Sequence, residues 1–243
     1  MARIVVLASG SGSNFQSLID NVERGFISKS RIVIAVSDKI DAHALERARK
    51  HKIEALYLNP KDYPSREDYD RKIVQEMKAR KVDLVLLAGY MRIVTPALLN
   101  EFPNAVMNIH PALLPSFPGL HAQKQALDWG VKVSGCTVHY VDSQVDHGPI
   151  IIQAAVPVEE GDTEETLAAR ILKQEHRIYP QAVKWHVEGK LALKDRRVTV
   201  SKSHTAGFSP QYDISNSMRT AASKTAVSSS SKSKPRGKAL QAR

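Results

Sequence analysis

The sequence predicts an α/β fold built on an open, mostly parallel sheet with helices on both faces. Short runs of β-branched and other apolar residues alternate with longer segments of helical periodicity through about residue 190. The apolar runs are nearly continuous, which is typical of strands buried on both faces. With 243 residues and 42% hydrophobic content, the chain is long enough to bury the core that such a sheet needs.

The expected elements follow one another in a regular order. Strands are predicted at six apolar runs, Ile4–Ala8, Ile32–Val36, Leu84–Ala88, Ala105–Ile109, Val133–Val141 and Ile150–Val156. Helices are predicted near residues 14–24, 41–51, 66–80, 121–129 and 163–188. Asp162 and Thr163 precede Glu164 and Glu165, a pattern that caps the last helix and puts acids in its first turn. Three prolines predict a loop across residues 111–119.

Residues 201–243 form a region of different composition. They are rich in Ser, Ala, Lys and Arg and offer few apolar side chains, so the region is expected to be a disordered tail after one domain of residues 1–200. The net charge of +10 belongs mostly to this end of the chain. From Lys194 to Arg243, eleven Lys or Arg face two Asp, a net of +9, and the remaining 24 basic and 23 acidic residues leave +1. A nucleic-acid partner is therefore not expected for the core and stays open only for the tail.

The composition also indicates where the protein works. No apolar run approaches the length of about eighteen residues that a membrane span needs. The N-terminus runs directly into a strand-like segment and lacks the layout of a cleavable signal peptide. The single cysteine, Cys136, excludes an internal disulfide framework and a multi-cysteine metal site. We therefore expect a cytoplasmic protein, either a monomer or a homodimer.

The segment Ser9–Asn14 joins the first strand to the first helix through Gly10 and Gly12. Glycines let the backbone turn sharply, and the helix start then presents free N–H groups to an anion such as phosphate. Phe15 stands where the dinucleotide fingerprint needs its third glycine, and no Gly-Lys-Ser/Thr of an NTPase loop is present. Asp38 could bind a ribose hydroxyl in a dinucleotide interpretation, but we expect it to cap a helix. The loop predicts a phosphate site.

Asn108, His110 and Asp146 form the group that says most about chemistry. Asn108 and His110 lie two residues apart at the end of a predicted strand, so both side chains can face one ligand. An amide N–H can stabilise an oxyanion and an imidazole can move a proton. Asp146, in a loop after a later strand, is expected to contact His110, raise the pKa of its imidazole and hold its protonated form. The group predicts an acyl-type transfer.

A protein nucleophile is hard to identify in this sequence. The serines Ser9, Ser11 and Ser13 belong to the predicted phosphate loop, and no Gly-x-Ser-x-Gly elbow is present. Cys136 lies inside a strand-like run and is interpreted as a small buried hydrophobe. This favours direct transfer between two bound substrates. No metal is expected, because zinc-like spacing is absent from His121, His139, His147 and His176, which are interpreted as capping, packing or surface residues.

At these residues the chain closely resembles the phosphoribosylglycinamide formyltransferases, or GAR transformylases, a folate-dependent family of purine synthesis. The resemblance covers roughly residues 1–190 and implies a Rossmann-like formyltransferase fold. The matching segments, in order, are Ser9–Asn14, Ser65–Glu67, Ala88–Ile93, Asn108–Pro115, Pro118–His121, Asp146–Pro149 and Gln174–Pro180. Tyr90, Ala112 and His147 are small departures that remove no functional group.

The resemblance implies a role for each matching residue. Asn108, His110 and Asp146 would be catalytic. Glycinamide ribonucleotide would be bound by Gly12, Ser13, Asn14, Lys173, Gln174 and Glu175. The co-substrate 10-formyltetrahydrofolate would be bound by Arg66, Met91, Arg92, Ile93, Val94, Asn108, Asp142, Ser143, Gln144, Val145 and Asp146.

Four other functions compete with this interpretation. A formyltetrahydrofolate deformylase uses a similar group but normally carries an extra N-terminal domain, for which the first strand at Arg3 leaves no room. A methionyl-tRNA formyltransferase needs a folded C-terminal domain where this chain has a polar tail. A nicotinamide-dependent oxidoreductase or a non-catalytic nucleotide-binding module would explain the glycine loop but not the Asn–His–Asp group.

Overall fold

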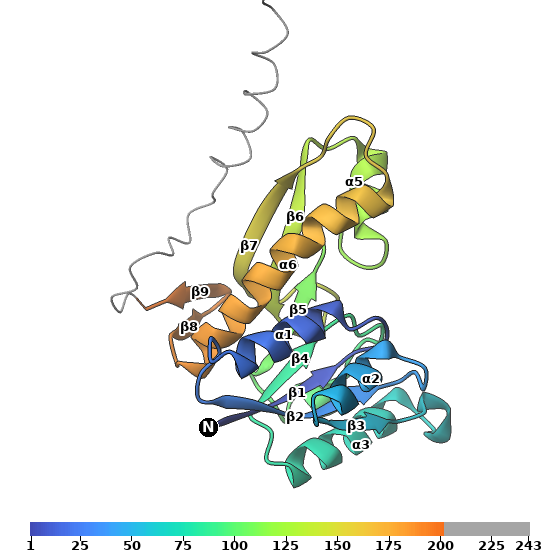
Figure 1. Cartoon of the computed structure of the whole chain (residues 1–243), viewed down its shortest axis with the longest axis vertical. Coiled ribbons are helices and arrows are strands. Elements are labelled where there is room, and N and C mark those ends of the chain that lie inside the picture. The colour runs from blue at the N-terminus through green and yellow to red at the C-terminus, as the bar shows by residue number, and fades with distance from the viewer. Residues whose placement is uncertain (202–243) are drawn as a thin grey trace, which may run out of the picture. The chain divides into compact units, whose positions relative to one another are not determined.

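The computed structural model describes residues 1–201 of the chain, and within them seven strands form one sheet (Figure 1). The strands are β1 Ala2–Leu7, β2 Ser30–Ser37, β3 Glu54–Tyr57, β4 Leu84–Leu87, β5 Val106–His110, β6 Val133–Tyr140 and β7 Ile150–Pro157. Their order in the sheet is β3-β2-β1-β4-β5-β6-β7. The first five are parallel, and β6 and β7 are antiparallel to their neighbours. The prediction of a mostly parallel sheet is confirmed.

Helices cover both faces of this sheet. They are α1 Ser13–Glu23, α2 His43–Lys50, α3 Arg66–Ala79, α4 Pro96–Leu99, α5 Ala122–Trp129 and α6 Glu164–Val187, with a short 3-10 turn η1 at Pro60–Asp62. Figure 1 shows α6 running along the β6–β7 part of the sheet with α1 beside it. No helix in residues 1–201 is both long and apolar enough to cross a membrane.

The core divides into two layers because successive strand residues point to opposite faces. In β1, Ile4 and Val6 pack into the layer that holds α1, α2, α5 and α6. Val5 and Leu7 pack into the other layer, where α3 supplies Ile73 among other residues and α4 supplies a leucine. All four β1 side chains are at most 1% exposed, which explains why the strands appear as continuous apolar runs.

The order of the strands indicates where a ligand is expected to bind. β1 lies between β2 and β4, so the connections from β1 and from β4 leave the sheet in opposite directions. Open α/β folds bind ligands at such a switch point, beyond the carboxyl ends of the strands. The loop Ser9–Gly12 follows β1, the segment Ala88–Thr95 follows β4, and β5 ends at His110. Three of the predicted site segments therefore meet at one edge of the sheet.

A hairpin outside the main sheet was not predicted. It consists of β8 Leu191–Lys194 and β9 Arg197–Val200, and Leu191, Val198 and Val200 pack against the core layer of α6. The short elements β3 and α4 were also not predicted. The predicted disordered tail, apart from Ser201, lies outside the described residues.

Candidate active site

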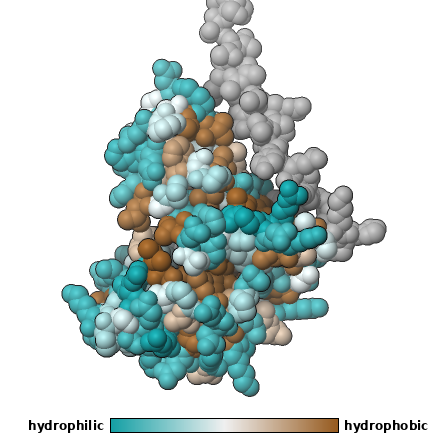
Figure 2. Space-filling model, turned by 180° about the vertical axis from the view of Figure 1, so that it is seen from behind, coloured by the Kyte–Doolittle hydropathy of each residue, from teal (hydrophilic) through white to brown (hydrophobic). Residues whose placement is uncertain are grey.

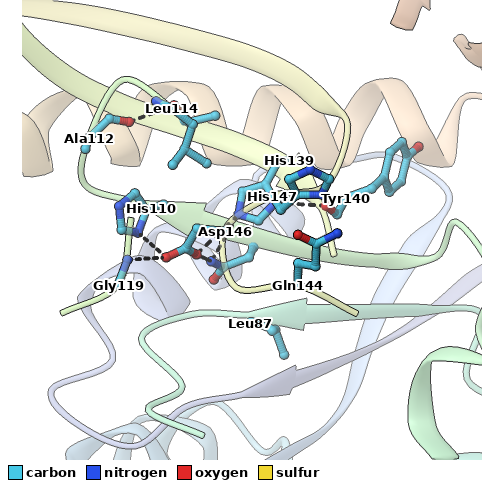
Figure 3. A network of polar contacts seen from close by, with 12 residues as sticks. Leu87, His110, Ala112, Leu114, Gly119, His139, Tyr140, Gln144, Asp146 and His147 are labelled. Atoms are coloured by element: carbon cyan, nitrogen blue, oxygen red, sulfur yellow. Dashed lines mark hydrogen bonds and ion pairs between the residues drawn. The ribbon is translucent and has the colours of Figure 1, made fainter. Parts of the chain in front are cut away.

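Asn108 and His110 both contact the carboxylate of Asp146. Asp146 lies in the loop between β6 and β7, and its Oδ2 is 3.3 Å from Nδ1 of His110 (Figure 3). Its other oxygen accepts from the amide Nδ2 of Asn108 at 3.3 Å. The backbone N–H of Gly119 donates to Oδ2 at 2.8 Å. The predicted contact between Asp146 and His110 is therefore present.

Opposing influences act on the charge predicted for His110. Its Nε2 lies 2.8 Å from the carbonyl oxygen of Phe117, so both ring nitrogens face acceptors, an arrangement that suits the protonated imidazole. The imidazole is, however, buried, with only 4% of the residue exposed. Burial lowers the pKa of His110 and outweighs Asp146 and the Phe117 carbonyl, which raise it. Asp146 therefore raises the pKa of His110 as predicted, but burial makes the net shift downward in the free protein, and the protonated state of His110 stays a prediction.

Asp146 itself is kept charged and in an unusual backbone conformation. Burial raises the pKa of its carboxyl, but contacts with His139, the Gly119 amide and His110 outweigh burial and hold the pKa below its ordinary value. Its φ of 50° lies in the left-handed region, which non-glycine residues avoid. Such a conformation persists only where neighbouring contacts enforce it.

His139 belongs to this group, although no such role was predicted for it. The antiparallel register sets it directly opposite Asn108, and its Nε2 is 3.3 Å from Nδ2 of Asn108. Its Nδ1 is 2.8 Å from the carbonyl oxygen of Tyr140, to which it can donate, leaving Nε2 to accept from the amide. The only available sequence signal was a histidine in a strand, because the register of β6 against β5 cannot be read from the residues.

The loop after His110 is tied to the sheet through Thr137. This residue stands opposite His110 in the β5–β6 register. Its buried hydroxyl donates to the carbonyl oxygen of Ala112 at 2.7 Å and accepts from the N–H of Leu114 at 3.1 Å. In the same loop, the Phe117 carbonyl contacts His110 and the Gly119 amide donates to Asp146. The predicted loop 111–119 therefore contributes backbone groups to the site.

The predicted phosphate loop has the geometry of an anion site. Gly12 adopts φ 69°, and a Cβ there would stand 2.9 Å from Cα and Cβ of Ala44. The helix α1 starts at the next residue, without a side-chain cap and without an acidic residue in its first turn. Its first N–H groups and the positive end of its dipole are therefore available to an anion.

Only one of the three predicted nucleotide residues on α6 reaches this loop. Glu175 is 7% exposed and accepts from Nδ2 of Asn14 at 2.6 Å. Burial raises the pKa of Glu175, and the bond from Asn14 only partly offsets it. Gln174 instead accepts from Arg177 on its own helix, and Lys173 is exposed, because successive helical residues point about 100° apart. Oδ1 of Asn14 is buried without a hydrogen-bond partner in the described residues.

The segment 91–94 alternates between solvent and core. Met91 and Ile93 are 62% and 55% exposed, whereas Val94 is buried in the layer of α3. Between them, the guanidinium of Arg92 lies 4.8 Å from the ring centroid of Tyr69. The predicted site residue Arg66 is exposed in the first turn of α3. The side chain of Val94 therefore anchors the segment in the core, while Met91 and Ile93 are available to a ligand.

Apolar residues at the surface mark the predicted folate segments. Figure 2 shows hydrophobic residues gathered in the middle of one face, between hydrophilic margins. Within residues 1–201 the exposed large apolar side chains are Met1, Ile40, Met91, Ile93, Leu120, Trp129, Val133 and Val145. Three of these eight belong to the two predicted folate segments, which is the composition expected where an aromatic ligand binds.

The loop 142–146 is organised by its first residue. Oδ1 of Asp142 accepts from the N–H of Gln144 at 3.0 Å, and its Oδ2 lies 2.7 Å from Nδ1 of His147. Ser143, Gln144 and Val145 are exposed, whereas Asp146 turns inward. The loop thus has an exposed part, residues 143–145, and a part that turns inward, the Asp146 carboxylate that contacts His110.

Two other sequence interpretations, those of Asp38 and Cys136, can be judged here. Asp38 does not cap α2, which follows Ala42 without a side-chain cap; it accepts from Oγ of Ser9 at 2.6 Å because β1 and β2 end side by side. Cys136 is fully buried, and burial raises the pKa of its thiol well above the ordinary value, as expected of an inert residue. Residues 1–201 contain no group of three or more His, Cys, Asp or Glu suited to a metal.

A cavity of about 660 Å³ lies beside the loop 111–119 but outside the polar group. It is lined by residues of that loop, of α5 and of β6, including Phe117, Trp129 and Ser134. None of Asn108, His110 and Asp146 lines it, so we assign the chemistry to the polar group and not to this cavity.

Comparison with known proteins identifies relatives of this chain. A sequence model described as "Formyl transferase" matches residues 2–183. Phosphoribosylglycinamide formyltransferase of Escherichia coli (strain K12) is 44% identical over 192 residues, which are 79% of this chain and 90% of that protein. The crystal structure of glycinamide ribonucleotide transformylase 1 from Symbiobacterium toebii is 54% identical, with a TM-score of 0.81, and the match covers 82% of this chain and 94% of that one.

A second kind of relative is much longer than this chain. The trifunctional purine biosynthetic protein adenosine-3 of Drosophila pseudoobscura pseudoobscura is 47% identical over 203 residues. The match covers 82% of this chain but only 14% of that protein. The chain therefore corresponds to one segment of the trifunctional relative and to nearly the whole of the shorter ones.

Proposed function

Since the chain belongs to the formyl transferase family, we propose that it transfers the formyl group of 10-formyltetrahydrofolate to the amine of glycinamide ribonucleotide. The products would be formylglycinamide ribonucleotide and tetrahydrofolate, in purine biosynthesis. Two relatives that this chain spans almost entirely are named phosphoribosylglycinamide formyltransferase and glycinamide ribonucleotide transformylase, and these names support this substrate. The observation that carries the proposal is the Asp146 carboxylate, which lies 3.3 Å from both the Asn108 amide and the His110 imidazole.

The nucleotide fits the side of the site formed by α1 and α6. Its phosphate would accept from the free N–H groups after Gly12, with Ser13 and Asn14 in the first turn. The buried Oδ1 of Asn14 is an acceptor without a donor, and a ribose hydroxyl is a donor of suitable size. Glu175, next to it, can accept from a second hydroxyl. The phosphate and the ribose would thus fix the amine in place.

The formyl donor fits the side formed by the segments after β4 and β6. Met91, Ile93 and Val145 offer exposed apolar surface to the pterin and benzoyl rings. Arg66 and Arg92 supply positive charge for the carboxylates of the glutamate portion. The loop Asp142–Asp146 would line the same substrate and deliver Asp146 to the reacting carbon. No metal is needed for this chemistry.

The first step is attack by a neutral amine on the formyl carbon. Burial lowers the pKa of His110, so the mechanism uses its imidazole in the neutral form, as the base that takes the amine proton. With Nδ1–H donated to Asp146, Nε2 is the nitrogen that receives the amine proton, as in other carboxylate–imidazole pairs. In the free protein Nε2 lies 2.8 Å from the Phe117 carbonyl oxygen, a contact that needs a proton on Nε2. Substrate must displace this contact, and the ring proton must lie on Nδ1, before Nε2 can act as the base.

The second step is collapse of the tetrahedral intermediate. One N–H of Asn108 turns from Asp146 or His139 to the oxyanion and stabilises its charge. The imidazolium of His110, held by the charge of Asp146, gives its proton to N10 of the folate. The bond from carbon to N10 then breaks, and the oxyanion returns to a carbonyl in the new formamide. No covalent enzyme intermediate forms in this mechanism.

The experiment that tests the function is a turnover assay with and without the nucleotide. We expect formation of tetrahydrofolate and formylglycinamide ribonucleotide in equal amounts, followed by folate absorbance and mass spectrometry, and no turnover without nucleotide. Formate release in the absence of nucleotide would show a deformylase instead. Formylation of methionyl-tRNA in place of the nucleotide would show the other family activity.

A further inference from the structure

The hairpin β8–β9 reaches the Asp146 loop from outside the segment that the family model matches. That segment ends at residue 183, whereas the two-residue turn of the hairpin consists of Asp195 and Arg196. The hairpin is anchored on the core by Leu191, Val198 and Val200. The N–H of Ser201 also donates to the carbonyl oxygen of Lys190 at 2.9 Å, which closes its base. The tip is therefore carried by a fixed element.

Arg196 at this tip binds the residue that follows Asp146. Its Nη2 donates to the carbonyl oxygen of His147 at 2.5 Å. Its Nη1 is 3.2 and 3.3 Å from the two ring nitrogens of His147, so the guanidinium lies against the imidazole and not in line with one lone pair. The ring is also held by Asp142, whose Oδ2 lies 2.7 Å from Nδ1. A chain of contacts thus joins the hairpin to the start of the loop.

The loop held by these contacts has little conformational freedom. Asp146 has its unfavourable φ of 50°, and a Cβ at Gly148 would stand 1.8 Å from the carbonyl oxygen of Tyr140. Relaxing Asp146 toward an ordinary conformation would rotate the peptide that follows it. The carbonyl that Arg196 holds belongs to the next residue, His147. Arg196 therefore opposes that relaxation from outside the loop.

We propose that Arg196 is a positioning residue of the formyl-transfer site. It fastens the loop Asp142–His147 to the hairpin, and so holds both the loop expected to line the formyl donor and the Asp146 carboxylate at His110. This role rests on the proposed function for its effect on catalysis, but the effect on the loop stands on the contacts alone. Arg196 touches neither the reacting atoms nor the nucleotide loop.

The kinetic test compares three variants of the full-length chain. Arg196→Ala should raise KM for 10-formyltetrahydrofolate about tenfold, as expected for about 1.4 kcal/mol, and lower kcat, while KM for glycinamide ribonucleotide stays within about twofold. Arg196→Lys should recover part of the loss, because a lysine can still donate to the His147 carbonyl. Arg197→Ala is the matched control, since it removes the same charge from an exposed neighbour on β9.

Two outcomes of this comparison would overturn the proposal. Kinetics of Arg196→Ala equal to those of Arg197→Ala would show that the contact with His147 has no functional effect. An equal rise of both KM values would indicate general loss of structure instead of a displaced loop.

A measurement without turnover separates this proposal from the proposed function. Hydrogen exchange followed by mass spectrometry should be faster in peptides covering residues 141–149 of Arg196→Ala, with residues 10–20 unchanged. Calorimetry with tetrahydrofolate alone should show weaker binding. Unchanged exchange in residues 141–149 would refute the positioning role. If the wild type makes no formylated nucleotide but the loop still loosens, the function is wrong and the structural role of Arg196 stands.

Discussion

At the scale of single residues, the chemistry depends on the protonation state of the His110 imidazole. Its two ring nitrogens face the Phe117 carbonyl and the Asp146 carboxylate, yet the ring is buried, and burial determines the direction of its pKa. In the proposed mechanism, the free protein holds a neutral base beside groups that favour the imidazolium. The proton released by the attacking amine would convert one form into the other when the charge is needed.

Replacing Asp146 by Asn should lower the pKa of His110 further. The carboxylate raises that pKa, so its loss disfavours the protonated ring. Proton NMR of the imidazole should give a pKa below 6.5 in the wild type and a lower one in Asp146→Asn. The acid limb of kcat/KM should move to lower pH in the same variant, because activity that needs neutral His110 is lost only as pH falls through its pKa.

The matched control for this titration is Asp142→Asn. Asp142 contacts His147 and not His110, so His110 should titrate as in the wild type. A His110 pKa above 6.5 in the free protein, or an acid limb that Asp146→Asn moves to higher pH, would contradict a neutral base.

The sequence predicted the side chains of the site better than its backbone groups. Asn108, His110 and Asp146 could be selected because amide, imidazole and carboxylate are the types this chemistry uses, and the structure brings them together. His139 was missed because its role depends on a cross-strand register. The Phe117 carbonyl and the Gly119 amide carry no signature of residue type. The burial that lowers the pKa of His110 could not be predicted because depth of burial is a tertiary property.

At the scale of elements, the turn from β1 into α1 depends on Gly12. Gly12→Ala would place a Cβ 2.9 Å from backbone and side chain of Ala44, at a left-handed φ of 69° that costs an alanine about 1–2 kcal/mol. The loop must then move away from α2, so KM for the nucleotide should rise about tenfold or more, with KM for the formyl donor nearly unchanged. Steady-state kinetics with each substrate varied in turn would measure this.

Gly10→Ala is the control for the same loop. Gly10 has no atom within 4 Å of the site of an added Cβ, and its φ is not in the left-handed region. Its KM for the nucleotide should stay close to that of the wild type. Equal effects of the two substitutions would show that the backbone shape at Gly12 does not matter for binding.

The start of α6 offers a test of stability against pH. Asp162 accepts from both terminal nitrogens of Arg170 at 2.7–2.8 Å, and this bonding, with the Glu159 amide and Thr166 hydroxyl, outweighs burial and lowers its pKa. A lowered pKa gives stability that is complete above the unfolded value of about 3.8 and is lost as pH falls through the folded value. Asp162→Asn should therefore lower the free energy of unfolding by about 2 kcal/mol at neutral pH.

Urea unfolding at several pH values measures the difference between Asp162→Asn and the wild type. The difference should be constant from pH 7 to about 5 and shrink below about 3.8. Glu160→Gln, an exposed carboxylate in the same turn, is the control and should change little. A difference that grows on acidification would have the wrong sign for a lowered pKa.

Long elements with clear periodicity were predicted, and short ones were not. The predicted helix at 163–188 is α6, and its cap is present, with Thr163 and Thr166 exchanging side-chain and backbone hydrogen bonds. The four-residue β3, α4, β8 and β9 offer too few positions to show a period. Strand order could not be predicted either, because neighbours such as β1 and β4 pair across a long stretch of chain.

At the scale of the whole molecule, the site is assembled from distant parts of residues 1–201. Asn14 and Glu175 are hydrogen-bonded although 161 positions separate them in the sequence, and Asn108 and Asp146 although 38 positions do. Every residue assigned to substrate or catalysis lies between Gly12 and Glu175, inside the segment that the formyl transferase family model matches. This agrees with relatives in which the same segment is nearly a whole protein or a small part of one.

Removing residues 204–243 should leave turnover nearly intact. The deleted segment contributes none of the proposed site residues, and the hairpin that carries Arg196 remains. We expect kcat and both KM values within about twofold of the full chain, measured in parallel at two salt concentrations because the deleted segment is basic. A large loss of kcat would show that residues 204–243 belong to the working enzyme.

The most direct measurement for the central claim is kcat of Asn108→Ala and His110→Ala at saturating concentrations of both substrates. If Asn108 stabilises the oxyanion and His110 moves the proton, each substitution should lower kcat by about 10²–10³, with much smaller changes in KM. Circular dichroism of both variants would verify that the fold is kept. Near-wild-type kcat in both variants would contradict the account.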